Sequence, residues 1–169
     1  HERGHKVMED NLVVSLYPES LFIASFLLFL GFMTLAVCSR NLALFWVALE
    51  GTTLVGAPLI YYNRNEHSLE AVWKFLILCS VGVALALMGV FFLSAAVKSG
   101  SGLGIVSLRL DDLFTASASF NQAWLKVAIL FLLVGFAVKT GLAPLHNWLP
   151  DAHSEAPAFV SSLFSGALL

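Results

Sequence analysis

Two ionisable residues lie deep inside long apolar stretches of this sequence. Glu50 stands near the middle of the apolar stretch 42–62, and Lys139 follows the stretch 124–138, whose only other charge is Lys126. A charged side chain near the middle of a bilayer costs roughly 2.5–3.5 kcal/mol on insertion scales. Proteins retain such residues where a partner, water or a function offsets that cost. Both residues are therefore candidates for groups that carry protons.

Each of the two residues also has a purely structural interpretation. Glu50 could be a protonated, hydrogen-bonded glutamate that only stabilises a helix bundle, and Lys139 could mark the far membrane interface. Lys126 can extend its ammonium to the near interface, but Lys139 lies about 20 Å farther along a helix. If Glu50 approaches Lys139, each charge favours the charged form of the other. Such a pair would act as a switch that releases a proton on separation.

A predicted helix break follows Lys139 directly, at Gly141 and Pro144. Proline removes one backbone donor and clashes with the preceding turn, so the helix cannot continue unchanged. Backbone carbonyls freed inside a membrane are tolerated only where the break is buried in protein or lines a wet cavity. An ionisable residue beside a broken helix is typical of an ion pathway in a transporter.

Other polar residues are weaker candidates for the same chemistry. Lys74 lies four residues after Glu70, the favourable order for a helical ion pair, so it is either an interfacial pair or a second proton site. His146 follows the helix break and titrates near neutral pH, which leaves its part in a pathway open. Asp151 and His153 are expected to cap or hydrogen-bond the turn in which they lie.

The composition indicates which elements must position these residues. Hydrophobic residues make up 59% of the 169 residues and charged residues 12%, against about 25% charged in a typical soluble domain. The apolar runs approach the roughly 20 residues that a spanning helix needs, and they lack the alternation of barrel strands. We therefore predict an all-α, polytopic membrane helix bundle.

The predicted organisation is a polar segment, 1–19, followed by a transmembrane region, 20–169. A flexible linker is expected at 99–104 and a short surface helix at 108–120. The broken span should resume as a short helical piece at 145–149, before a turn at 150–157. The expected spans are residues 20–37, 42–62, 69–97, 124–149 (broken near 140–144) and 158–169.

The sequence lacks the patterns of common cofactor sites. Cys38 and Cys79 form no CxxC or Cys/His cluster, and neither a Walker motif nor a dinucleotide-binding glycine fingerprint is present. We therefore expect no cofactor, metal or catalytic redox site in this chain. Its energy would come from a partner subunit or an ion gradient. The terminal residues, His1 and Leu169, suggest a piece of a longer chain.

Three stretches carry a resemblance to a known family. The stretch 135–157, GFAVKTGLAPLHNWLPDAHSEAP, resembles the signature of antiporter-like proton-translocating membrane subunits. These occur in respiratory complex I, membrane-bound nickel–iron hydrogenases and multisubunit cation/proton antiporters. Residues 46–50, WVALE, resemble the glutamate-bearing helix of the family. Residues 70–82, EAVWKFLILCSVG, are most similar to the hydrogenase branch, in particular hydrogenase-4 component F.

The resemblance implies a fold and residue roles. The chain would form the first half of an inverted-repeat, antiporter-like fold with one broken helix. Glu50 matches the essential glutamate of the family and Lys139 the essential lysine of its broken helix. Lys74 falls near a further lysine, and His146 falls in the central hydrophilic axis. Phe159 departs from the pattern, because proline is commoner there, which affects only the start of the last span.

The function implied is proton translocation coupled to electron transfer in partner subunits of a hydrogenase or an NADH/quinone-type oxidoreductase. The expected partners are the other membrane and peripheral subunits, and the expected location is a prokaryotic inner membrane. Two alternatives remain open at this point. One is a subunit of a multisubunit sodium/proton antiporter, and the other is a non-conducting membrane scaffold.

Overall fold

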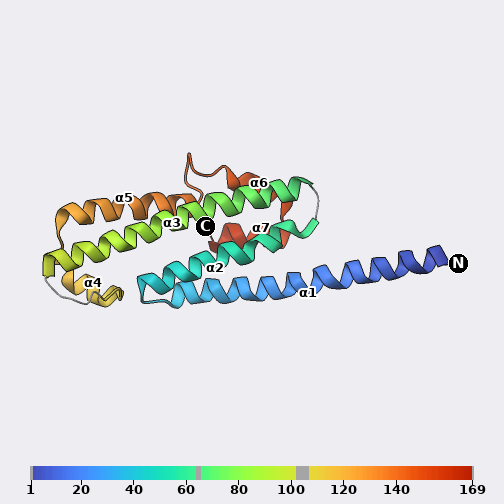
Figure 1. Ribbon diagram of the computed structural model, residues 1–169, viewed down its shortest axis with the longest axis horizontal. Helices are drawn as coiled ribbons and strands as arrows, with labels where there is room; N and C mark the ends of the chain where they lie inside the picture. Colours follow the sequence, from blue (N-terminus) through green and yellow to red (C-terminus); the bar gives the residue numbers. More distant parts are fainter. Residues whose placement is uncertain (1, 64–65, 102–106, 169) are drawn as a thin grey trace.

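The computed structural model describes the backbone of residues 2–63, 66–101 and 107–168, and the side chains of 20–62, 66–100 and 107–166. The described residues form an elongated bundle of helices, in which α1, α2, α3 and α5 follow the long axis (Figure 1). This arrangement confirms the predicted all-α class. The helices are α1 (Glu2–Cys38), α2 (Leu42–Ile60), η1 (Tyr61–Asn63), α3 (Glu66–Ser101), α4 (Leu110–Ala116), η2 (Ser117–Ser119), α5 (Gln122–Lys139), α6 (Trp148–Glu155), α7 (Ala158–Leu163) and η3 (Phe164–Leu168).

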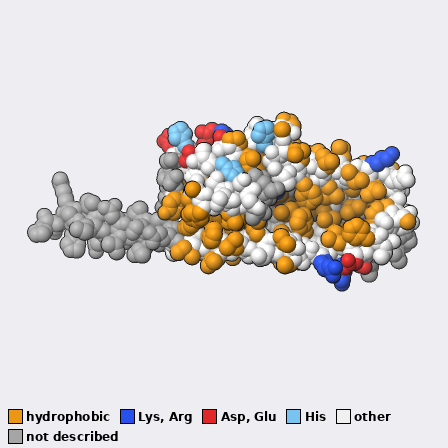
Figure 2. Space-filling model, turned by 180° about the vertical axis from the view of Figure 1, so that it is seen from behind, with side chains coloured by type: hydrophobic (Ala, Val, Ile, Leu, Met, Phe, Trp, Pro, Cys, Tyr) orange, Lys and Arg blue, Asp and Glu red, His pale blue; other side chains and the backbone are white. Residues whose placement is uncertain are grey.

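Four helical segments of the described chain are long and apolar enough to cross a membrane. Figure 2 shows a broad hydrophobic band across one face, with charged side chains gathered toward its two ends. This distribution suits a bilayer, whose core excludes charge while its interfaces accept it. The segments are Ser20–Cys38, Leu42–Ile60, Glu66–Gly100 and Gln122–Lys139.

Two helices extend beyond the spans predicted from polarity. Helix α1 already begins at Glu2, so residues 2–19 of the predicted polar segment continue into the first apolar span as one helix. Helix α3 runs from Glu66 to Ser101, outside the predicted 69–97 at both ends. An apolar run shows only which part of a helix can lie in the hydrocarbon core of a bilayer. The helix itself continues as long as its backbone hydrogen bonds are made, whether in water or in lipid.

Local capping explains where two of the spans begin. The side chain of Asn41 accepts hydrogen bonds from the backbone N–H groups of Ala43 and Leu44 at the start of α2. Asn121 does the same at the start of α5. Asparagine is a preferred N-cap because its side-chain oxygen satisfies N–H groups that have no partner within the helix.

The connection between α3 and α5 is fastened to the turn between α1 and α2. Leu42 N–H donates to the carbonyl of Leu108, and Leu110 N–H donates to that of Arg40, both at 2.9 Å. The predicted surface helix at 108–120 is present as α4 and η2, none of whose residues is buried. Residues 102–106 of the predicted linker lie outside the described residues, while 99–101 end α3.

Helices α3 and α5 pack side by side because glycines bring their backbones together (Figure 1). A Cβ atom added at Gly135 would lie 2.5 Å from the backbone nitrogen of Ala86 and 2.6 Å from the carbonyl oxygen of Gly82. Small residues at helix contacts are typical of membrane bundles, in which close packing replaces the hydrophobic effect. This contact sets the position of the carboxyl end of α5 against α3.

The predicted break ends α5 at Lys139 through a glycine cap. Gly141 has φ 65°, and the hydrogen bonds of Gly141 N–H to Val138 and of Leu142 N–H to Ala137 form a Schellman motif. The left-handed conformation favours glycine, which lacks the Cβ clash. The break therefore satisfies its own carbonyls by local turns.

The short helix after the break is displaced from its predicted place. Residues 145–147 are a turn rather than a helical piece, and the expected turn at 150–157 is mostly α6, which runs from Trp148 to Glu155. Proline usually signals a turn, but Pro150 occupies the first turn of α6. Its missing N–H would have no intrahelical partner there, so proline is tolerated.

Candidate functional site

Lys139 is buried at the last residue of α5, where the membrane-spanning helix stops. It is 2% exposed, and its Nζ donates a hydrogen bond of 2.7 Å to Thr53 Oγ1 on α2. The ammonium also lies 5.7 Å from the ring centroid of Phe75 on α3, within reach of a cation–π contact. A buried ammonium with a neutral hydroxyl as acceptor is poised to change partners, since it has three donors.

Glu50 faces the same interior from one turn earlier on α2. Its Oε1 accepts a hydrogen bond of 3.2 Å from the hydroxyl of Ser80 on α3. Its Oε2 is buried and has no hydrogen-bond partner among the described residues. A carboxylate accepts several hydrogen bonds when ionised, so this oxygen is open to a further donor.

The structure brings Glu50 and Lys139 to neighbouring positions without joining them. No ion pair connects their side chains in the part of the chain that the structure describes. Glu50 and Thr53 are three residues apart on α2 and share one face of that helix. Lys139 therefore binds one turn away from the carboxylate that the sequence suggested as its partner.

Trp148 fastens the broken end of α5 to the rest of the bundle. Its side chain is fully buried, and its indole Nε1–H donates a hydrogen bond of 2.9 Å to the carbonyl of Val138. Its ring lies 5.3 Å from that of Phe75 between centroids. The same Phe75 ring faces Lys139, so one aromatic side chain contacts both the lysine and the tryptophan.

Lys74 lies on the outside of the bundle rather than beside Lys139. Its ammonium binds Glu70 and Asp151, each at 2.7 Å, with 44% of the side chain exposed. The predicted pair with Glu70 is present, and Asp151 reaches across to α3 instead of capping its own turn. Lys74 precedes Phe75 in the chain, so the cluster and the buried site belong to successive residues of α3.

The two histidines after the break take different positions. His146 lies in the turn before α6, and its buried Nδ1 has no hydrogen-bond partner among the described residues. No hydrogen bond joins His146 to Lys139 in the described part of the chain. The Nδ1 atom of His153 is hydrogen-bonded to the hydroxyl of Ser161 at 2.5 Å. His153 thus ties α6 to α7.

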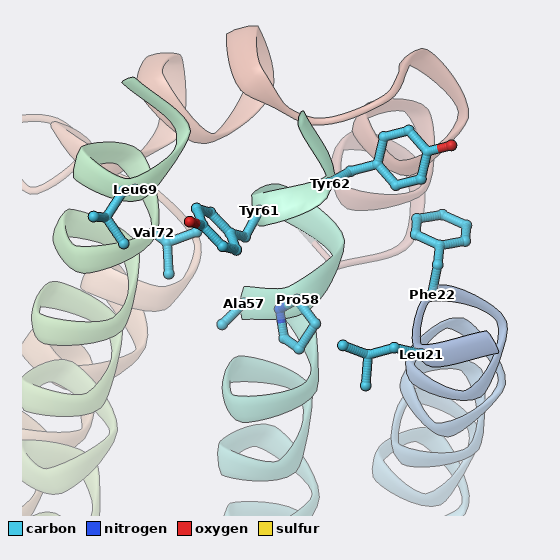
Figure 3. A pocket seen from close by; sticks show the side chains of 8 residues that line it. All are labelled: Leu21, Phe22, Ala57, Pro58, Tyr61, Tyr62, Leu69 and Val72. Carbon is cyan, nitrogen blue, oxygen red and sulfur yellow. The ribbon is translucent and has the colours of Figure 1, made fainter. Parts of the chain in front are cut away.

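An apolar pocket lies where α1, α2, η1 and α3 meet (Figure 3). The Tyr62 ring contacts Phe22 edge-on, with 5.1 Å between ring centroids. The residues that line the pocket carry no charge and include neither Glu50 nor Lys139. The lining residues are Leu21, Phe22, Ala57, Pro58, Tyr61, Tyr62, Leu69 and Val72.

Sequence reasoning missed the side chains that hold the two charges. Thr53 could have been found, because it lies three residues after Glu50 on a predicted helix. Ser80, Phe75 and Trp148 carry no such signal, since their contacts depend on how α3 packs against α2 and α6. Among the described residues, no group of three or more His, Cys, Asp or Glu side chains is placed to hold a metal ion.

Known proteins are similar to this chain in sequence. Residues 39–169 match the family model described as NADH:quinone oxidoreductase/Mrp antiporter, TM. The chain is 41% identical over 137 residues to the hydrogenase-4 component F homolog of Methylacidiphilum infernorum, covering 81% of this chain and 29% of that protein. It is 34% identical over 152 residues to NADH-quinone oxidoreductase subunit N 2 of Aquifex aeolicus, covering 89% of this chain and 29% of that protein.

A solved structure shows the same fold. One chain of the membrane-bound sulfane sulfur reductase, an archaeal respiratory membrane complex, superposes with a TM-score of 0.74 at 26% identity. The match covers 85% of this chain and 28% of that chain. The sequence thus spans less than a third of the length of the relatives that it matches.

Proposed function

Because the chain belongs to the NADH:quinone oxidoreductase/Mrp antiporter transmembrane family, we propose that it is part of a proton-translocating membrane subunit of an oxidoreductase complex. Partner subunits, in the membrane and peripheral to it, would carry out electron transfer. The complex would lie in a prokaryotic inner membrane. The redox cofactors would belong to the partners.

The buried ammonium of Lys139 is the observation that carries this proposal. A cation with 2% exposure inside a membrane bundle is costly unless it is paired or used. Its acceptor is the neutral hydroxyl of Thr53, at 2.7 Å, rather than a carboxylate. A purely structural lysine would gain more from an ion pair with Glu50. The absence of that pair favours a group that exchanges partners and protons.

The helix break supports the same function. It places Lys139 at the end of α5, where a turn rather than further helix follows. Transporters commonly bind ions where a helix is interrupted within the membrane. Lys74 and His146 are proposed as further members of the route, because Lys74 directly precedes Phe75 on α3 and the buried Nδ1 of His146 lacks a hydrogen-bond partner among the described residues.

The test is to neutralise each charge in the full-length protein within its complex. We expect Lys139→Met and Glu50→Gln each to reduce the protons translocated per electron to background in membrane vesicles, with the complex still assembled. Lys126→Met is the matched control for Lys139, because Lys126 is an exposed lysine on the same helix. Normal translocation in both site variants would refute the proposal and favour the scaffold alternative.

The same vesicles separate the antiporter alternative. A proton pump driven by electron transfer translocates protons in sodium-free buffer. An antiporter subunit instead moves protons only against a sodium gradient, and without any electron donor. The family description includes both classes, so proton uptake is measured with and without sodium and with and without the donor.

A further inference from the structure

We propose that the hydroxyls of Thr53 and Ser80 are positioning groups that hold Lys139 and Glu50 apart, so that the structure represents the separated state of a two-position switch. The inference deepens the proposed function and rests on it. It names the group that binds each charged side chain when Glu50 and Lys139 are not paired with each other.

Each charge already has its own neutral hydroxyl partner. Lys139 Nζ donates to Thr53 Oγ1 at 2.7 Å, and Glu50 Oε1 accepts from Ser80 at 3.2 Å. The two hydroxyls come from different helices, α2 and α3. The separated charges are therefore stabilised independently of each other.

The Thr53 hydroxyl is oriented to accept and not to donate. Its own proton is directed to the backbone carbonyl of Leu49, 3.2 Å away. A hydroxyl has one donor and two acceptor lone pairs, so engaging the donor leaves the lone pairs for the ammonium. Thr53 is also fully buried, which excludes bulk water as a competing partner for Lys139.

The second position of the switch is present in the same structure. Glu50 Oε2 is buried and lacks a hydrogen-bond partner among the described residues. Because Glu50 and Thr53 are i and i+3 on α2, their Cβ atoms lie roughly 5–6 Å apart. The four-carbon stem of a lysine can cross such a distance by rotamer changes. Lys139 can therefore exchange Thr53 for Glu50 without movement of a helix.

The neighbouring residue Thr52 provides a matched control. Thr52 is also fully buried, and its hydroxyl also donates to the Leu49 carbonyl, at 2.7 Å. It makes no hydrogen bond to Lys139. Replacing either threonine by valine removes one hydroxyl from the same turn of α2, but only Thr53→Val removes the acceptor of Lys139.

The experiment uses the full-length protein in its complex and two measurements. Infrared difference spectroscopy identifies the carboxyl band of Glu50 by its loss in Glu50→Gln, and vesicles report the protons translocated per electron. We expect Thr53→Val to favour the Glu50–Lys139 pair by roughly tenfold, as loss of a hydrogen bond to a charged group implies. The Glu50 band should move and translocation should fall. Thr53→Ser, which keeps a hydroxyl at this position, should leave the band and translocation as in the unmodified protein, and Thr52→Val should change neither.

Defined outcomes overturn the inference. The inference is wrong if Thr53→Val leaves the Glu50 band in place. It is also wrong if Thr53→Ser or Thr52→Val moves that band as far as Thr53→Val does. If Thr53→Val does not accumulate in the membrane, Thr53→Ala takes its place and must move the same band, because it also removes the acceptor of Lys139 without touching Glu50. Failure of the proposed function is distinct, because normal translocation in both Lys139→Met and Glu50→Gln would refute proton transfer through these residues, while the infrared result still decides where Lys139 binds.

Discussion

Lys139 contacts side chains from two helices, and a third helix binds the backbone just before it. Thr53 on α2 accepts its hydrogen bond, Phe75 on α3 presents a ring, and Trp148 on α6 binds the carbonyl of the preceding residue, Val138. None of these partners is charged. The ammonium of Lys139 therefore has no charged hydrogen-bond partner, which is compatible with the proton-carrying role proposed for it.

Trp148→Phe is expected to loosen the broken end of α5 without emptying the core. It removes one buried hydrogen bond, which contributes about 0.5–1.5 kcal/mol, while Trp148→Ala would cost about 3–5 kcal/mol through the cavity. The amount of intact complex after graded heating measures the difference. Trp73→Phe is the control, because that side chain is 58% exposed. Equal heat sensitivity of Trp148→Phe and the unmodified complex would exclude a role for the indole N–H.

At the scale of elements, the contact between α3 and α5 decides where the site forms. Gly82 and Gly135 let the two backbones approach closely, and Gly135 lies one turn before Lys139. Helix α3 also carries Ser80 and Phe75, so the depth of α5 against α3 determines which side chains face Lys139. The cluster of Lys74 with Asp151 holds α6 against the same helix at the surface. Surface ion pairs contribute little to stability, so this cluster mainly fixes the position of α6 relative to α3.

Gly135→Ala tests the helix contact. Its new Cβ would lie 2.5 Å from the backbone nitrogen of Ala86, so one helix must shift. Overpacking of this kind costs about 1–3 kcal/mol, and we expect reduced membrane accumulation and weaker proton translocation. Gly31→Ala is the matched control, since nothing lies within 4 Å of its added Cβ. That substitution should leave accumulation unchanged or raise it, because alanine favours a helix. If both variants behave alike, close packing at Gly135 is not required.

At the scale of the whole molecule, the charge distribution separates an apolar middle from polar ends (Figure 2). The four apolar segments leave many large side chains exposed, among them Ile23, Leu27 and Leu130. Such a surface requires lipid or further helices as its environment. The matched stretch is 29% of the length of each of two relatives, so these relatives contain further residues beyond it.

Extraction experiments test this picture of the molecule. We expect the protein to stay in the membrane pellet after treatment with alkaline carbonate, because removing several apolar spans from a bilayer is very unfavourable. A peripheral subunit of the same complex serves as the control and should be released. Recovery of the protein in the carbonate supernatant would contradict a multi-pass arrangement.

Much of the fold follows from the sequence alone, because the bilayer imposes simple rules. Apolar runs long enough to span a bilayer must be helices. Gly141, followed three residues later by Pro144, ends one of these helices at Lys139. The motif around Lys139 and the stretch before Glu50 were sufficient for the family, which the comparisons confirm. The two charges were identified because charge inside an apolar run is rare and costly.

Only the tertiary structure decided which side chains face each charge. The sequence suggests a pair between Glu50 and Lys139, but helix packing gives Lys139 the hydroxyl of Thr53 and Glu50 that of Ser80. Neutral hydroxyls leave no trace in hydropathy or charge pattern, and their contacts depend on the rotation and depth of α2, α3 and α5. The boundary of α6 likewise depends on Trp148 being drawn into the core. Hydropathy and the energetic cost of charge in a membrane locate Glu50 and Lys139 along the chain. Distances of a few ångströms between helices decide which nearby group each of them binds.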